Sequence, residues 1–101
     1  MSLESLEESI IKWAEERKIF EKANYGSQFE KTCEEVGELA KGLIESDYNK
    51  TRDAIGDVVV TLILLADMHG MSLQECLQAS YDEIKDRTGK MVDGVFIKDE
   101  K

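Results

Sequence analysis

Acidic residues fall in two short stretches of the chain, and their spacing places each group on one side of a helix. At about 100° per residue, Glu34 and Glu38 lie about 40° apart around the helix, and Glu35 lies about 60° beyond Glu38. Asp53 and Asp57, one turn apart, also share a face. Oxygen donors gathered in this way suit hard cations, and no histidine is placed to help, which disfavours zinc and di-iron. The spacing makes a metal site plausible, and Mg²⁺ would fit it by binding few carboxylates and sharing its other positions with water and phosphate.

The carboxylates also have a plainer interpretation as a solvated surface. On the helix with the three glutamates, the acidic face lies roughly opposite the apolar stripe, as on any amphipathic helix. Asp57 favours the metal site, because it shares a stripe with Val60 and Leu64 and lies at the mouth of a segment that must be buried. A buried carboxylate without a partner is costly, and repulsion from neighbouring carboxylates raises the pKa values unless a cation intervenes. The position of Asp57 therefore favours a cation site over an ordinary solvated surface.

A phosphate-bearing ligand would need basic side chains near these carboxylates. Lys31 precedes Glu34 by one helical turn, and Lys85, Arg87 and Lys90 cluster where the last helix is expected to end. Cations at a helix C-terminus are also favoured by the helix dipole alone, so this cluster has two explanations. Trp13 could stack on a nucleobase, although its helical spacing is more often that of a core residue.

The apolar periodicity predicts an all-α domain of four helices followed by a short β-hairpin. The helices are expected at residues 2–18, 27–45, 49–68 and 72–88, and the hairpin at 91–97 around a two-residue turn at Asp93 and Gly94. Predicted helix starts are a Ser27–Glu30 capping box, an Asn49 cap and a Ser72–Glu75 capping box. The apolar stripe of the second helix consists of Phe29, Cys33, Val36, Ala40 and Leu43.

The third helix is apolar nearly all round after Asp57, so it needs cover on several sides. Four short helices from one chain can scarcely provide that cover, and we therefore expect a dimer that shares a central bundle. Gly37 and Gly56 interrupt the second and third helices, where each costs about 1 kcal/mol relative to alanine. We expect them to permit a close helix crossing that brings the acidic side chains together.

Length and composition narrow the possible functions. A chain of 101 residues supports one domain, and a net charge of −9 argues against binding to nucleic-acid phosphates. The longest apolar run, 58–66, is nine residues long and far short of the roughly 20 needed to span a membrane. Two cysteines without metal-site spacing are expected to be reduced thiols. With no N-terminal signal pattern, these features predict a cytoplasmic protein that binds neither nucleic acid nor membranes.

Three segments resemble the MazG-like nucleotide pyrophosphohydrolases. Residues 31–40 (KTCEEVGELA) are similar to the E-E-x-x-E segment of that family, and residues 53–58 (DAIGDV) are similar to its E-x-x-D segment. Residues 84–96 (IKDRTGKMVDGVF) resemble the tail of the small, single-domain, often phage-encoded members. The resemblance spans roughly residues 10–98, with the three segments in the family's order.

This resemblance implies a four-helix MazG-like bundle, assembled as a homodimer or homotetramer. It also implies Mg²⁺-dependent hydrolysis of a nucleoside triphosphate to the monophosphate and pyrophosphate, with Mn²⁺ as an alternative ion. Glu35 and Glu38 match the metal-binding pair of the first motif, and Asp57 matches the aspartate of the second. Glu35 is also the candidate general base, by its likeness to the family's residue in that role, and Glu34, the leading acid of the motif, is the second catalytic candidate.

The second motif departs from the family at one position. Its glutamate falls at position 54, which is Ala54 in this chain. Asp53, one residue earlier and one turn from Asp57, could supply a carboxylate from the same face. The missing glutamate leaves two other interpretations open: a family member that binds nucleotide without cleaving it, and a non-catalytic acidic helical protein that mimics nucleic-acid phosphates or docks on a basic partner.

Overall fold

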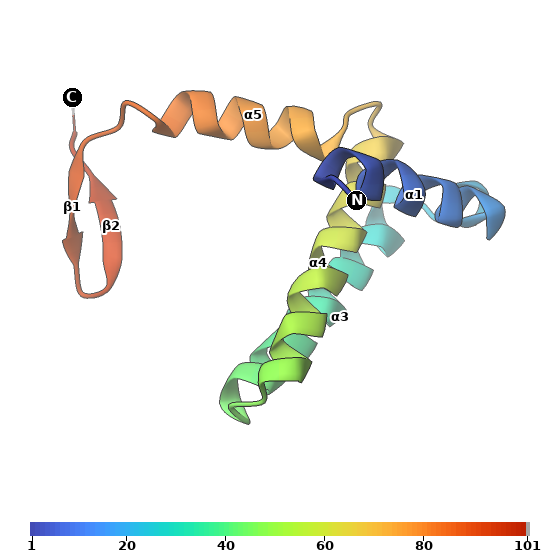
Figure 1. Ribbon diagram of the computed structural model, residues 1–101, viewed down its shortest axis with the longest axis horizontal. Coiled ribbons are helices and arrows are strands. Elements are labelled where there is room, and N and C mark those ends of the chain that lie inside the picture. The colour runs from blue at the N-terminus through green and yellow to red at the C-terminus, as the bar shows by residue number, and fades with distance from the viewer. Residues whose placement is uncertain (101) are drawn as a thin grey trace.

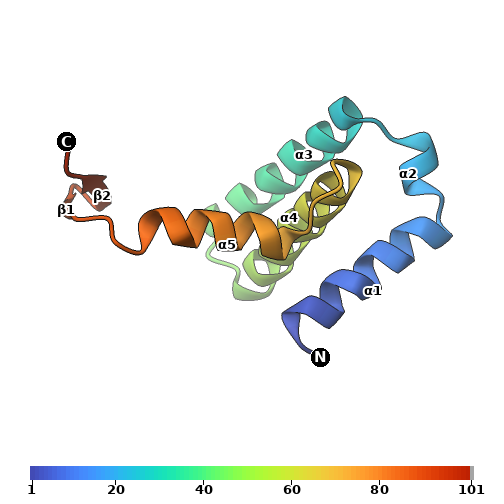
Figure 2. The ribbon, with the colours of Figure 1, turned by 90° about the horizontal axis from the view of Figure 1, so that it is seen from above.

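The computed structural model describes residues 1–100, which form five helices and one antiparallel β-hairpin. Helices α3 and α4 form a long helical hairpin, α1 lies beside α4, and α5 leaves the end of α4 and leads to the strands (Figure 1). The view from above places the strands at the far end of α5, away from α1, α2, α3 and α4 (Figure 2). The predicted mostly helical chain with a C-terminal hairpin is confirmed. The elements are α1 (Leu3–Glu16), α2 (Ile19–Lys22), α3 (Tyr25–Ile44), α4 (Tyr48–Met68), α5 (Leu73–Ile84), β1 (Gly89–Val92) and β2 (Val95–Lys98).

Two of the three predicted helix starts are wrong, each by a few residues. Asn24 caps α3, with Ser27 at the third helical position completing a reciprocal capping box, so the predicted Ser27–Glu30 box does not form. Asp47, not Asn49, caps α4 by accepting from the Lys50 amide. The predicted box at the start of α5, between Ser72 and Glu75, is confirmed.

The first predicted helix forms as α1, and a further helical turn that was not predicted, α2, follows it. α1 stops at Glu16, and Lys18 takes a left-handed conformation with φ of 60° before the single turn of α2. This break directs Ile19 and Phe20 back onto a small core formed by Ala14, Ile63 and Leu64, which packs α1 and α2 against α4. The burial gained by these two apolar side chains accounts for the left-handed residue.

α3 packs on α4 through a polar flank and leaves its apolar stripe uncovered. Gln28 and Thr32 are buried against α4, and Gln28 Nε2 donates to the Thr61 carbonyl over 3.1 Å. The stripe lies about a quarter turn round the helix from this flank, with Phe29 59% and Leu43 61% exposed. An amphipathic helix ordinarily buries its stripe. In this chain α3 therefore retains an apolar face for a further contact.

The close approach of α3 and α4 occurs at Gly42. A Cβ atom there would lie 2.9 Å from Thr51 Oγ1 and 3.0 Å from the Thr51 amide nitrogen, so only glycine fits without movement of α4. At Gly37 and Gly56 an added Cβ would meet nothing within 4 Å. The prediction that these two glycines permit the helix crossing is therefore wrong within one protomer.

The C-terminal part of the chain, which we call the arm (α5, β1 and β2), projects from the body. Every strand residue is exposed, and those of α5 are exposed or half-buried. The two-residue turn forms as predicted, with φ of 50° at Asp93 and 82° at Gly94. At the base of the arm, the buried Glu7 carboxylate of α1 accepts a hydrogen bond from the Leu73 amide.

Within residues 1–100, no single helix combines the length and hydropathy needed to cross a membrane, and α4 with α5 meets those two criteria only as a pair bent by 98°. Cys33 is exposed and Cys76 is half-buried, and both are free thiols.

Candidate active site

The carboxylates predicted as metal ligands line a single cleft. Glu35 and Glu38 extend into it from α3, and Asp53 and Asp57 from α4. The helices bring them together because α3 and α4 run antiparallel, with Gly42 holding the two backbones close. We call this cavity of about 440 Å³ the acidic cleft. It is lined by Glu35, Glu38, Asp47, Asn49, Lys50, Asp53, Ala54 and Asp57.

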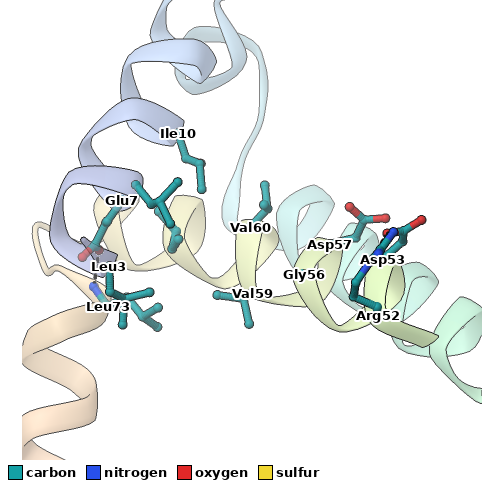
Figure 3. Close-up of a pocket in the computed structure, with 12 residues that line it drawn as sticks. Leu3, Glu7, Ile10, Arg52, Asp53, Gly56, Asp57, Val59, Val60 and Leu73 are labelled. Carbon is teal, nitrogen blue, oxygen red and sulfur yellow. Dashed lines mark hydrogen bonds and ion pairs between the residues drawn. The ribbon is translucent and has the colours of Figure 1, made fainter. Parts of the chain in front are cut away.

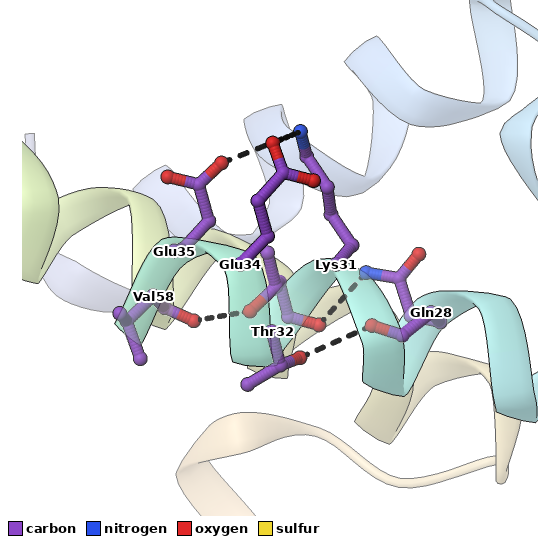
Figure 4. A network of polar contacts seen from close by, with 7 residues as sticks. Gln28, Lys31, Thr32, Glu34, Glu35 and Val58 are labelled. Atoms are coloured by element: carbon purple, nitrogen blue, oxygen red, sulfur yellow. Dashed lines mark hydrogen bonds and ion pairs between the residues drawn. The ribbon is translucent and has the colours of Figure 1, made fainter. Parts of the chain in front are cut away.

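A polar network beside the cleft fixes the position of Glu35 (Figure 4). The Glu35 side chain is 14% exposed and lies 3.4 Å from Lys31 Nζ, which also lies 3.3 Å from Glu34. Hydrogen bonds to these two carboxylates raise the pKa of Lys31 above its usual value, so this lysine stays charged. Lys31 therefore orients and neutralises Glu35. Glu34 is 64% exposed and lies outside the cleft lining.

Asp53 and Asp57 also belong to a second cavity, the groove between α1 and α4 (Figure 3). This groove has a volume of about 530 Å³ and is mostly apolar, with Gly56 in its wall and Leu3, Ile10 and Leu73 among its lining residues. The two aspartates stand where the groove and the acidic cleft meet. Asp53 is held by the adjacent Arg52, whose guanidinium lies 3.0 Å from its carboxylate.

The donor set of the cleft suits a hard cation. All four predicted ligands are carboxylates, and an ion that keeps several of its waters needs only one or two of them. Among the side chains of residues 1–100, no three His, Cys, Asp or Glu residues converge closely enough to share one ion as they lie. Glu38 and Asp57 face the same cavity from opposite helices, which is the placement that a hydrated Mg²⁺ could bridge.

The basic side chains of the body near the cleft are already paired. Lys50 lies 2.9 Å from Glu45, and hydrogen bonding to that carboxylate raises the pKa of Lys50. Lys31 is held by Glu34 and Glu35, as described above. Five carboxylates and one lysine line the cleft, so its electrostatic potential is strongly negative. A polyphosphate could enter only with cations that offset this charge.

The structure does not bring the other predicted substrate-binding residues to the cleft of the same chain. Lys85 and Arg87 lie at the end of α5, where they pair with Asp82 at 3.6 Å and Glu83 at 3.5 Å, and Lys90 lies on β1. The arm carries all three away from α3 and α4 (Figure 1). Trp13 is half-exposed on α1, where the Arg17 guanidinium lies 4.7 Å from the centre of its ring.

Three residues of the cleft and one buried carboxylate were not identified from the sequence. Asp47, Asn49 and Lys50 line the cleft at the start of α4. A helical hairpin returns the chain beside Glu38 at that point, so the short loop itself was the available signal. Glu7 lies on an amphipathic helix with no local sign that it would cap α5, sixty-six positions along the chain.

Comparisons with known proteins give one informative similarity. No family model and no solved structure matches the chain. Over 64 residues it is 38% identical to an uncharacterized 18.2 kDa protein from the rep-hol intergenic region of Haemophilus phage HP1, strain HP1c1. The aligned part is 63% of this chain and 39% of the phage protein, so the chain spans about two fifths of that relative's length. The chain is thus similar to a phage protein, in keeping with the phage-type resemblance of its motifs.

Proposed function

We propose that this protein is a Mg²⁺-dependent nucleoside triphosphate pyrophosphohydrolase that converts a (d)NTP and water to the (d)NMP and pyrophosphate. The observation that carries the proposal is the common cleft of Glu35, Glu38, Asp53 and Asp57, which come from two helices and two separate motifs. An ordinary solvated acidic surface would not require the two groups to meet. The resemblance of their motifs to the MazG-like family supplies the reaction.

Each carboxylate then has a defined task. Glu38, Asp57, Asp53 and Glu35 would hold the ion once their side chains turn towards it, and Mg²⁺ (or Mn²⁺) would supply charge neutralisation on the phosphates. Glu35 accepts the proton of the attacking water as general base, near the α-phosphorus. Lys31 holds the Glu35 carboxylate in position for that transfer. The chain works as a homodimer or homotetramer whose α3–α4 hairpins form a four-helix bundle.

Pyrophosphate release from a panel of standard and modified (d)NTPs tests this function directly. With Mg²⁺ we expect release from at least one nucleotide, and with EDTA we expect none, because the phosphate charges would face uncompensated carboxylates. The first active nucleotide also begins to define base and sugar preference. Absence of release across the panel, from protein shown to be folded by circular dichroism, would refute the proposed activity.

One observation favours a second candidate, a nucleotide-binding protein that does not cleave. Ala54 lies in the lining of the cleft and is only 2% exposed, at the position where the related motif has its glutamate. Asp53, the proposed replacement, is more exposed and is paired with Arg52. If the Asp53 side chain cannot turn towards the ion, the cleft would still bind nucleotide and metal, but it would lack one metal ligand and would not cleave the nucleotide.

The Ala54→Glu variant separates these two candidates. In EDTA we expect this variant to melt below the wild type, since an unpaired carboxylate at a buried position costs about 1–3 kcal/mol or more. Mg²⁺ should restore much of the loss, and Ala54→Gln should show no such rescue. If Asp53 already serves as ligand, pyrophosphate release should rise less than about tenfold. A rise from undetectable to robust release would instead identify the natural chain as a binder.

A further inference from the structure

The α3–α4 hairpin has two broad faces of opposite character. One face carries the acidic cleft. At 100° per residue, the α3 stripe lies on the other face, together with Ile55 and Leu62 of α4, which are exposed as well. This second face continues into a hollow of about 330 Å³ between α4 and α5, where Leu62, Met71 and Cys76 are among the lining residues. The hairpin and α5 thus form an L-shaped surface that we call the apolar corner.

The arm extends this apolar surface and has little to support it within the chain. The apolar side of α5 begins at Cys76 in the hollow and continues through Leu77, Tyr81 and Ile84, each at least half exposed. Strand residues such as Met91 and Phe96 are exposed too. A helix of 12 residues and a lone two-stranded hairpin are each marginal in water. The arm therefore requires a partner surface.

The charges of the arm and of the acidic cleft indicate which surface the end of the arm contacts. The segment from Lys85 to Lys90 carries three basic residues and one acid, on an otherwise strongly acidic chain. The pairs of Lys85 with Asp82 and of Arg87 with Glu83 are largely solvent-exposed, so these side chains lose little by exchanging them for cleft carboxylates. The acidic cleft has five carboxylates and a single lysine. These two regions are complementary, yet the arm directs the basic segment away from the cleft of its own chain (Figures 1 and 2).

The length of the arm is sufficient for an exchange between copies. At 1.5 Å per residue, α5 spans about 18 Å, and the chain from its end at Ile84 to Lys90 can extend at most about 20 Å further. Two packed helices are about 20 Å wide. An arm that leaves the apolar corner can therefore cross the exposed face of a partner's α3–α4 hairpin and reach round its edge to the opposite face.

We infer that a second copy of this chain fills the apolar corner, and that the arm of each copy brings Lys85, Arg87 and Lys90 to the acidic cleft of the other. The pairing buries the α3 stripe and the apolar side of α5 in one interface. It also supplies the cations that each cleft lacks. Within the proposed function, on which this part of the inference rests, these side chains bind the phosphates of the nucleotide.

Cross-linking of isotopically mixed protein tests the exchange without any reference to catalysis. Unlabelled and ¹⁵N-labelled chains are unfolded together, refolded, treated with a carbodiimide and digested for mass spectrometry. We expect isopeptide links from Lys85 or Lys90 to Glu38, Asp53 or Asp57, with half of them joining a light and a heavy peptide. Lys85→Arg with Lys90→Arg is the matched control, because arginine keeps the charge but cannot form the amide.

Several outcomes would overturn the inference. Links that join only peptides of the same isotope would mean that the arm folds back on its own cleft. A monomer by light scattering, or a dimer in which the arm lysines link to no cleft carboxylate, would equally reject the exchange. These results are independent of pyrophosphate release, so an inactive protein with mixed links would retain the exchanged arms and lose only the proposed reaction.

A subunit-mixing assay gives the same inference a functional readout in a protein that is active. Glu38→Gln removes a cleft ligand, and Arg87→Ala removes an arm cation. In an exchanged dimer built from one chain of each variant, one cleft combines intact carboxylates with an intact arm. We expect the refolded mixture to recover about a quarter of wild-type activity, since half the dimers are mixed and each has one complete site. No gain over the separate variants would contradict exchange.

Discussion

Replacing Glu38 with glutamine is expected to reduce Mg²⁺-dependent pyrophosphate release by about 100-fold or more. The substitution keeps the shape of the side chain and removes the negative charge, on the residue that faces Asp57 across the acidic cleft. A factor of 100 corresponds to about 3 kcal/mol of transition-state stabilisation, within what a bound metal ion contributes. The measurement is kcat/KM at saturating Mg²⁺, followed by a Mg²⁺ titration to show whether higher concentrations restore activity.

Glu34→Gln is the matched control for this experiment. Glu34 carries the same charge four residues earlier on α3, but it is solvent-exposed, paired with Lys31 and outside the cleft lining. We expect a change of less than about tenfold, because an exposed ion pair contributes roughly 1 kcal/mol at most. Glu38 is exposed, so neither variant should alter the melting temperature appreciably. Equal losses of activity in both variants would show that the activity depends on the overall negative charge of α3 and not on a metal site in the cleft.

Replacing Val36 with aspartate is expected to convert the oligomer into monomers. Val36 lies in the α3 stripe and is half-exposed in the isolated chain, so the substitution leaves the protomer's own core unchanged. In the proposed interface the substituted side chain would bury an unpaired carboxylate. This should reduce the free energy of association by about 2–4 kcal/mol, which corresponds to a dissociation constant about 30- to 1000-fold larger. Light scattering across a dilution series gives that constant. Pyrophosphate release should fall in parallel, because each cleft would lose its partner's arm.

Lys41→Gln controls for charge in the same experiment, since it also makes the chain more negative by one unit. Lys41 is exposed on α3 and lies well away from the stripe, about a third of a turn from its centre. We expect wild-type assembly from this variant. If Val36→Asp assembled as tightly as Lys41→Gln, the α3 stripe would not form the interface, and the apolar corner would need a different occupant.

The elements of the fold were predictable because their signals are local. The three- and four-residue apolar spacing located the long helices, and the two-residue turn at Asp93 and Gly94 located the hairpin. Helix starts were less predictable, because several capping residues stand within a few positions of each other. Asn24 competes with Ser27 for one start, and Asp47 competes with Asn49 for the other. The choice depends on which residue reaches extended backbone, which the tertiary structure decides.

The arrangement of the elements was not predictable, because periodicity identifies an apolar face without identifying what covers it. The stripe of α3 is such a face, and α3 meets α4 through the polar flank of Gln28 and Thr32. The glycine that permits this approach is Gly42 and not the motif glycines, since only Gly42 stands opposite the backbone at Thr51. The meeting of the carboxylates was predictable from their motifs. The separation of the basic cluster was not, because it depends on the direction in which α5 leaves the body.

The hydrogen bond from the Leu73 amide to Glu7 holds the arm at its base, so a small rotation at that point moves the far end of the arm by a large distance. Since α5 is about 18 Å long, a rotation of about 10° at Leu73 displaces Arg87 and Lys90 by roughly 3 Å. That is as large as the difference between a hydrogen bond and no contact. The contact at Leu73 therefore fixes the approximate direction of the arm, but it does not position Arg87 and Lys90 to within a hydrogen-bond distance. The exact position of the basic residues must be fixed at the far end of the arm, by contacts of the apolar strands with the partner copy. Mutations in the β-hairpin should therefore weaken the proposed phosphate binding, although no hairpin side chain other than Lys90 would contact a phosphate.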